Sequence, residues 1–200
     1  ANKDTVKAEK HPSLYMYDGN NCKVLVDANN STIPAGFRIS DKRPVSFTND
    51  GTIALFGVRR IPVEKDTTIP DFEKAKLDIW TWNEDYLQPV QKINLKREME
   101  HAYLCGIVAD GSSSQIITYA NPDFPRVNIT DRNTQEYIMV ECDKPYRVQQ
   151  QWNREALSDF YKVSIKDGSK KLYKKGVSYR IHGTSPDGRY YVYYDFADRN

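Results

Sequence analysis

Hydrophobic residues occur in short runs that are separated by turn residues, a pattern typical of β-strands. Three of the turns contain an Asp-Gly pair, at Asp18-Gly19, Asp110-Gly111 and Asp167-Gly168. Asp-Gly between two strand-like runs is a strong hairpin signal, because glycine accepts the positive φ that a tight turn needs. The sequence therefore predicts antiparallel hairpins that pair 14–17 with 23–26, 103–108 with 115–119, and 160–165 with 171–173.

A second kind of turn alternates with these hairpins and follows short strands with small polar side chains. Its three copies span 46–51, 128–133 and 183–188, with Thr48, Thr130 and Ser185 in register. Each copy precedes a strongly apolar strand, at 53–58, 137–140 and 190–194. The first two of these strands do not alternate apolar and polar residues, which indicates burial on both faces.

The alternation of the two turns predicts an all-β fold, a partial β-propeller with about three four-stranded antiparallel blades. The expected units are the outer hairpin of one blade at 13–28, a second blade at 44–120, a third at 125–176 and the start of a fourth at 179–200. Long insertions at 61–100 and 144–157 both connect strand 2 to strand 3 of a blade, so they are expected on one face. Three blades do not close a ring, so we expect open lateral faces and self-association.

The insertions carry the residues that we single out as candidate contacts to a substrate or a partner domain. We expect an additional strand at 77–83 and a short helix at 94–101 with Asn94 as its cap. The candidate contact residues are Trp80, Trp82, Tyr86, Tyr146, Arg147 and Trp152. Two interpretations stay open, since these side chains either form a small core that holds the loops or contact a partner.

The sequence offers no catalytic, cofactor-binding or metal-binding residues. The run Gly183-Thr184-Ser185-Pro186-Asp187 lacks the second glycine of a nucleophile elbow. The three histidines, His11, His101 and His182, match neither a catalytic triad nor a zinc site. Glu98 and Glu100 are two positions apart and diverge on a helix.

Composition narrows the class of protein further. The net charge is only +2, and the one lysine cluster, at 170–175, is interpreted as a solvated strand face, which disfavours nucleic-acid binding. No apolar run approaches the roughly 18 residues of a membrane span. Cys22, Cys105 and Cys142 are interpreted as small buried hydrophobic residues and not as a disulfide or metal site.

The first insertion resembles a known family. Residues 65–89, which include Asp78-Ile79-Trp80-Thr81-Trp82, resemble the amino-terminal propeller of large bacterial, dipeptidyl-peptidase-like serine peptidases of the prolyl oligopeptidase family. The stretches 143–147 and 185–199 are similar to the same proteins, so the resemblance spans roughly residues 40–200. It implies a parent hydrolase with an α/β-hydrolase domain, whose Ser, Asp and His triad lies outside this chain.

The resemblance also implies a function. The chain would be a non-catalytic propeller domain that gates access and helps select peptide substrates for the hydrolase domain of the same polypeptide. The implied location is the periplasm or cell envelope, and the implied partners are that domain and a peptide. The alternative is a stand-alone protein-interaction or ligand-binding propeller scaffold. A glycan-binding propeller would use Trp80 and Trp82 but would need a carboxylate pair that the sequence does not offer.

Overall fold

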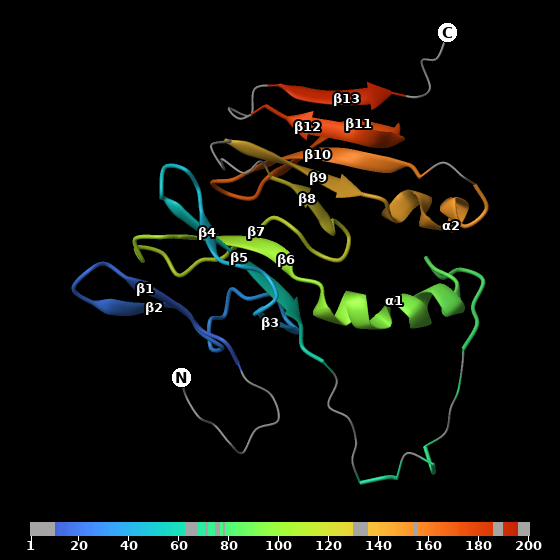
Figure 1. The fold of residues 1–200 in the computed structure, drawn as a ribbon, viewed down its shortest axis with the longest axis horizontal. Helices are drawn as coiled ribbons and strands as arrows, with labels where there is room; N and C mark the ends of the chain where they lie inside the picture. Colours follow the sequence, from blue (N-terminus) through green and yellow to red (C-terminus); the bar gives the residue numbers. More distant parts are fainter. Residues whose placement is uncertain are drawn as a thin grey trace.

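The protein is mostly β, with antiparallel sheets of which none is closed. The structure is a computed structural model, and it describes residues 11–62, 68–70, 72–74, 77, 79–129, 136–153, 156–185 and 190–195. The sheets follow one another in chain order and stack face to face, from the hairpin near the N-terminus to the hairpin near the C-terminus (Figure 1).

The first two sheets occupy the N-terminal half of the chain. β1 (Leu14–Tyr17) pairs with β2 (Cys22–Val26) as a hairpin. The second sheet contains β3 (Phe37–Ile39), β4 (Ser46–Phe47), β5 (Ile53–Arg60), β6 (Tyr103–Val108) and β7 (Ile117–Thr118). Its order is β3-β5-β6-β7, and β4 also pairs with β5.

The C-terminal half repeats this arrangement. The third sheet contains β8 (Arg126–Asn128), β9 (Tyr137–Cys142), β10 (Ser158–Ser164) and β11 (Lys170–Val177), in the order β8-β9-β10-β11. β12 (Tyr179–Thr184) and β13 (Tyr191–Asp195) form a final hairpin. Strands β4 to β7 and β8 to β11 are thus two successive four-stranded antiparallel meanders.

The three Asp-Gly hairpins are confirmed. Gly19, Gly111 and Gly168 have φ values of +97°, +73° and +72°, in the left-handed region that favours glycine. In each turn the aspartate Oδ1 accepts a hydrogen bond from a backbone N–H two or three residues later in the chain. Asp18 accepts from Asn21 at 2.7 Å, Asp110 from Ser112 at 2.7 Å, and Asp167 from Ser169 at 3.0 Å. Hydrogen bonding within the turns lowers the pKa of the three carboxyl groups, mainly from the Ser112 side chain at Asp110 and from the backbone N–H groups at Asp18 and Asp167.

The second kind of turn is also confirmed where the structure describes it. Thr48 Oγ1 accepts the Ile53 N–H at 3.0 Å and donates to Asp50 Oδ1 at 2.6 Å, which closes the turn between β4 and β5. The pairing of β12 with β13 flanks Ser185 as predicted. Residues 130–135, between β8 and β9, and residues 186–189, between β12 and β13, lie outside the described residues, so only the first copy of the turn is described in full.

One hydrophobic core runs through successive sheets. β5 and β6 are buried over most of their length, and their core residues pack with Leu25 and Val26 of β2 and with Val140 and Val163 of the third sheet. Burial of β5 and β6 on both faces explains their lack of apolar–polar alternation.

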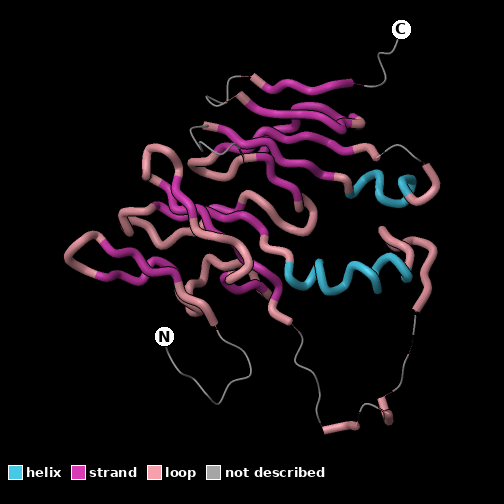
Figure 2. Tube along the Cα trace, viewed as in Figure 1, coloured by secondary structure: helices cyan, strands magenta, loops and turns pink. Residues whose placement is uncertain are grey.

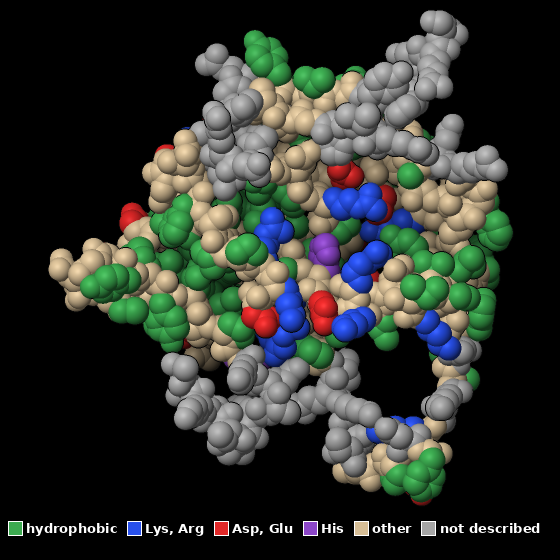
Figure 3. Space-filling view, in the orientation of Figure 1, with side chains coloured by type: hydrophobic (Ala, Val, Ile, Leu, Met, Phe, Trp, Pro, Cys, Tyr) green, Lys and Arg blue, Asp and Glu red, His purple; other side chains and the backbone are tan. Residues whose placement is uncertain are grey.

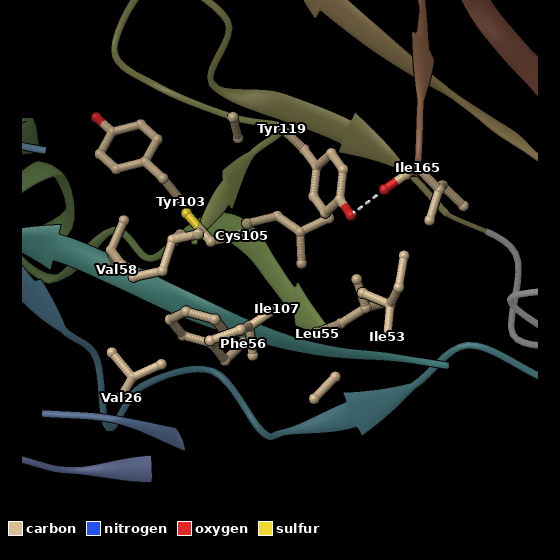
Figure 4. Packing of buried hydrophobic residues seen from close by; sticks show 14 of the residues in the cluster. Val26, Ile53, Leu55, Phe56, Val58, Tyr103, Cys105, Ile107, Tyr119 and Ile165 are labelled. Carbon is tan, nitrogen blue, oxygen red and sulfur yellow. Dashed lines mark hydrogen bonds between the residues drawn. The ribbon is translucent and has the colours of Figure 1, made fainter. Parts of the chain in front are cut away.

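Tyr119 joins the second sheet to the third inside this core. Its side chain is fully buried, and its hydroxyl donates to the carbonyl oxygen of Ile165 at 2.5 Å (Figure 4). The ring lies against Gly106 of β6, where an added Cβ would be 2.6 Å from the tyrosine oxygen. Burial raises the pKa of Tyr119, so the hydroxyl stays a donor at all physiological pH values.

Two local expectations are corrected, and one strand was not predicted. The described residues of 77–83 form no strand, because they lie in the connection between β5 and α1 and pair with none of the sheets. The helix α1 spans Gln88–Glu100 and has no Asn94 cap, since Pro89 in its first turn provides a helical φ and lacks an N–H. β3 was not expected at all.

The cysteines divide into two groups. All three are free; Cys105 and Cys142 are buried as expected, whereas Cys22 is exposed, which corrects the expectation for that residue. Burial raises the pKa of the Cys105 thiol to about 12. Cys22 lies beside the β1–β2 turn, where a strand-like sequence does not ensure burial.

We expect Tyr119→Phe to lower the free energy of unfolding by about 1–2 kcal/mol, because it leaves the Ile165 carbonyl buried without its donor. Urea unfolding followed by tyrosine and tryptophan fluorescence measures the change. Tyr15→Phe is the matched control, since Tyr15 is 62% exposed, and it is expected to change stability by less than about 0.5 kcal/mol. Equal stability of the two variants would contradict the role of Tyr119.

Candidate functional site

The two long connections lie on the same side of the molecule. The connection from β5 to β6 contains α1, and the connection from β9 to β10 contains a 3-10 turn, η1 (Lys144–Tyr146), and the short helix α2 (Arg147–Gln150). Both helices emerge from the same ends of their sheets (Figure 2). We call the surface formed by the described residues of these two connections the insertion face.

Arg147 holds the two connections together. Its Nε donates to Asp143 Oδ1 at 2.8 Å, and its Nη1 donates to Asp85 Oδ2 of the first connection at 3.0 Å. The guanidinium also lies 5.3 Å from the centroid of the Tyr86 ring, a cation–π distance. Gln151 Nε2 adds a hydrogen bond to the Asp85 carbonyl oxygen at 2.8 Å.

A second set of polar contacts fixes this assembly to the third sheet. Asp143 is only 5% exposed, and its other oxygen, Oδ2, lies 3.3 Å from Arg126 Nη2 of β8. The Tyr146 hydroxyl donates to the buried Asp159 Oδ1 at 2.7 Å, and the Gly176 N–H donates to the same oxygen at 2.9 Å. The Tyr146 hydrogen bond, together with burial, raises the pKa of Tyr146 to about 12.

The six predicted contact residues therefore divide into two groups. Tyr146 and Arg147 are partly or largely buried in the network that holds the loops in place, and Tyr86, which is 38% exposed, belongs to it through its contact with Arg147. Trp80, Trp82 and Trp152 are 64%, 94% and 76% exposed. The structure thus brings together the first group, whereas the three tryptophans remain on the surface.

The first connection exposes further apolar side chains. α1 has no buried residue, and Ile93 and Leu95 on it are 81% and 60% exposed. Phe72 and Leu77 earlier in the same connection are 85% and 78% exposed. Large exposed apolar side chains concentrated in one region are typical of a contact surface.

A cationic cavity of about 360 Å³ lies beside the base of α1. It is lined by Lys42 and Arg43 from the segment between β3 and β4, and by Arg97, Glu100, His101 and Ala102 at the end of α1. Figure 3 shows Lys and Arg side chains gathered around a histidine on this part of the surface. Glu98 does not join Glu100 there, since its carboxylate lies 3.8 Å from Arg97 on the exposed helix surface.

Sequence reasoning missed this cavity, because its basic residues come from two segments that are far apart in the chain. The available signal was the adjacent pair Lys42-Arg43, which is separated from β4 by Pro44 and Val45. Without β3, nothing indicated that the pair lies across β5 and meets the end of α1.

Other kinds of site find no support among the described residues. No group of three or more His, Cys, Asp or Glu side chains has an arrangement that could hold a metal ion there. None of the helices in that part of the chain is long and apolar enough to cross a bilayer. Comparison with protein-family models, with curated proteins and with solved structures gives no match. The function is therefore argued from the geometry.

We expect Arg147→Gln to lower the free energy of unfolding by about 2–3 kcal/mol, because it removes charged hydrogen bonds from a guanidinium that is only 11% exposed. Hydrogen exchange should rise at residues 84–91 and 144–153, the segments that Arg147 joins.

The control is Arg97→Gln, since Arg97 is 72% exposed and its ion pair with Glu98 is long. Unchanged hydrogen exchange at 84–91 in the Arg147 variant would show that the two connections are held by other contacts.

Proposed function

We propose that the chain is a non-catalytic arc of β-propeller blades in a serine peptidase of the prolyl oligopeptidase family. The observation that carries the proposal is the repetition of one meander, β4 to β7 and then β8 to β11, with a long connection between the second and third strands of each. Stacked four-stranded meanders of this kind are the building units of propellers.

The flanking hairpins fit the same scheme. β1–β2 precedes the first meander and corresponds to the third and fourth strands of a blade, whereas β12–β13 follows the second meander and corresponds to the first and second. The Asp-Gly turn of each blade would then lie between its third and fourth strands. This assignment accounts for the alternation of the two turn types along the chain.

The insertion face is the surface proposed to meet the hydrolase domain of the same polypeptide. Arg147 and Asp85 stiffen the two connections, and Trp80, Trp82 and Trp152 project from them into solvent. Exposed aromatic side chains on a rigid support lose little conformational entropy when a partner covers them. The propeller would restrict entry to peptides and help select them, in the periplasm or cell envelope.

We expect the purified chain to lack hydrolysis of peptidyl p-nitroanilides, because it would not contain the nucleophile, base and oxyanion hole of the parent. The reading frame that encodes it is expected to continue through further blades to a Gly-x-Ser-x-Gly motif.

Hydrolysis that survives stringent purification would contradict the non-catalytic role. A reading frame that ends within one or two blades would favour the stand-alone interaction scaffold instead.

We also expect the isolated chain to self-associate, because an open arc leaves apolar lateral faces uncovered. On β1 and β2, Tyr15, Tyr17 and Val24 are 62%, 70% and 54% exposed. Light scattering coupled to size exclusion should give a mass above 23.1 kDa that rises with concentration. Tyr15→Lys with Val24→Lys should reduce it, and a monomer at every concentration would count against the open arc.

A further inference from the structure

The cationic cavity beside α1 arises from a gap in the pairing of β5. β3 pairs with Val58, Arg59 and Arg60, whereas β4 pairs with Ala54 and Leu55 on the same edge. Between these strands, residues 40–45 leave the ladder and cross β5 near Gly57, whose carbonyl oxygen accepts the Ser40 N–H at 2.8 Å. This crossing places Lys42 and Arg43 at the wall of the cavity.

Arg43 is held against the sheet by close packing. A Cβ added at Gly57 would be 2.8 Å from Arg43 Cβ and 3.0 Å from Ala102 Cβ, so the absence of a side chain at position 57 makes room for the arginine. The Lys42 N–H donates to Ser40 Oγ at 3.1 Å, which orients the start of the segment. The base of the Arg43 side chain and the backbone at Lys42 are thus positioned before any ligand arrives.

The charge of Arg43 is not balanced within the described part of the chain. Arg59, Arg126 and Arg147 each have a carboxylate within ion-pair distance, whereas Arg43 has none there and is half-buried. Burial lowers the pKa of the Arg43 guanidinium, and the only opposing influence comes from Cys105. A partly buried cation without a counter-charge is costly, and an anionic ligand would offset that cost.

The rest of the lining sets the ligand's size and charge. Lys42, Arg43 and Arg97 supply three positive charges, against the negative charge of Glu100 in the lining and that of Glu98, which lies 3.8 Å from Arg97, so the balance stays positive. The volume of about 360 Å³ accommodates one or two residues of a peptide. The planar guanidinium of arginine matches a carboxylate through two parallel hydrogen bonds. Glu100 would repel a second carboxylate and accept a peptide N–H.

We infer that this cavity binds a carboxylate of a peptide ligand through Arg43, with Lys42 and Arg97 beside it. The inference rests on the proposed function for the class of ligand, since peptides are the proposed substrates. The carboxylate comes either from the C-terminus of the peptide or from an acidic side chain. The site therefore selects among peptides by charge, at a place separate from the exposed tryptophans.

Calorimetric titration of the full chain with three N-acetylated tetrapeptides tests the inference. The first is tetra-alanine with a free C-terminus, the second is its C-terminal amide, and the third is the amide with one aspartate. Binding of the first alone assigns a C-terminal carboxylate, and binding of the third but not the second assigns a side-chain carboxylate. Equal binding of all three, or no binding of any, would overturn the inference.

Variants then show whether binding occurs in the cavity. Arg43→Gln is expected to lower the affinity for the peptide about tenfold or more. Arg43→Lys is expected to retain part of that affinity. Lys42→Gln changes an exposed side chain that does not support the fold, and it should lower the affinity for the peptide several-fold. Lys175→Gln removes an exposed lysine on β11 and is the matched control, with unchanged affinity expected.

Two further outcomes separate this inference from the proposed function. If Arg43→Gln and Lys42→Gln leave peptide binding unchanged, the carboxylate binds outside the cavity. That result overturns the proposed site, whichever enzyme the chain belongs to. If succinate binds in an Arg43-dependent way and none of the peptides binds, the cavity is an anion site, and the inference that its ligand is a peptide is wrong. The reading-frame test concerns the parent enzyme alone, so the two proposals can fail independently.

Discussion

Burial of each central strand on both faces is the constraint on which the rest of the structure depends. β5, β6 and β9 need an apolar layer above and below them, and each sheet obtains it from its neighbours in the stack. The contact is not only apolar, since the Tyr119 hydroxyl satisfies the Ile165 carbonyl of the next sheet. A buried donor and acceptor at this interface fix the position of one sheet on the other, because misplacement would leave both unsatisfied.

The stack also determines where variation in length is tolerated. Two of the three Asp-Gly turns lie close to a neighbouring sheet; Gly168 has Ile117 Cγ2 3.0 Å, and Gly111 has Leu25 Cδ2 3.6 Å, from where its Cβ would be. Long connections are therefore found at the opposite ends of the strands, where α1 and α2 extend away from the core. There the loops need their own support, and the largely buried guanidinium of Arg147 provides it by joining two segments that are about sixty residues apart in sequence.

Local chemistry explains why much of the β-structure could be predicted from the sequence. Asp18, Asp110 and Asp167 each accept a backbone N–H within their own turn, so these hairpins depend on a few adjacent residues. The short β3 could not be predicted, because it forms only through its pairing with β5. The described residues of 77–83 have strand propensity, but they pair with none of the open sheet edges, and strand propensity without a pairing partner forms no strand. For the candidate site, the aromatic insertions could be located from the sequence. The place of Arg43 in the cavity could not, because it depends on packing against the distant Gly57 and on the end of α1.

Sequential stacking has a consequence for how the protein unfolds. Each sheet is stabilised mainly by the sheets before and after it, so the total stability approximates a sum of individual sheet energies and nearest-neighbour interface energies. The β1–β2 and β12–β13 hairpins have fewer such interfaces than the two central sheets. Opening should therefore begin at the two ends of the stack and move inwards, and the β5–β6 and β9–β10 ladders should exchange their amide protons last.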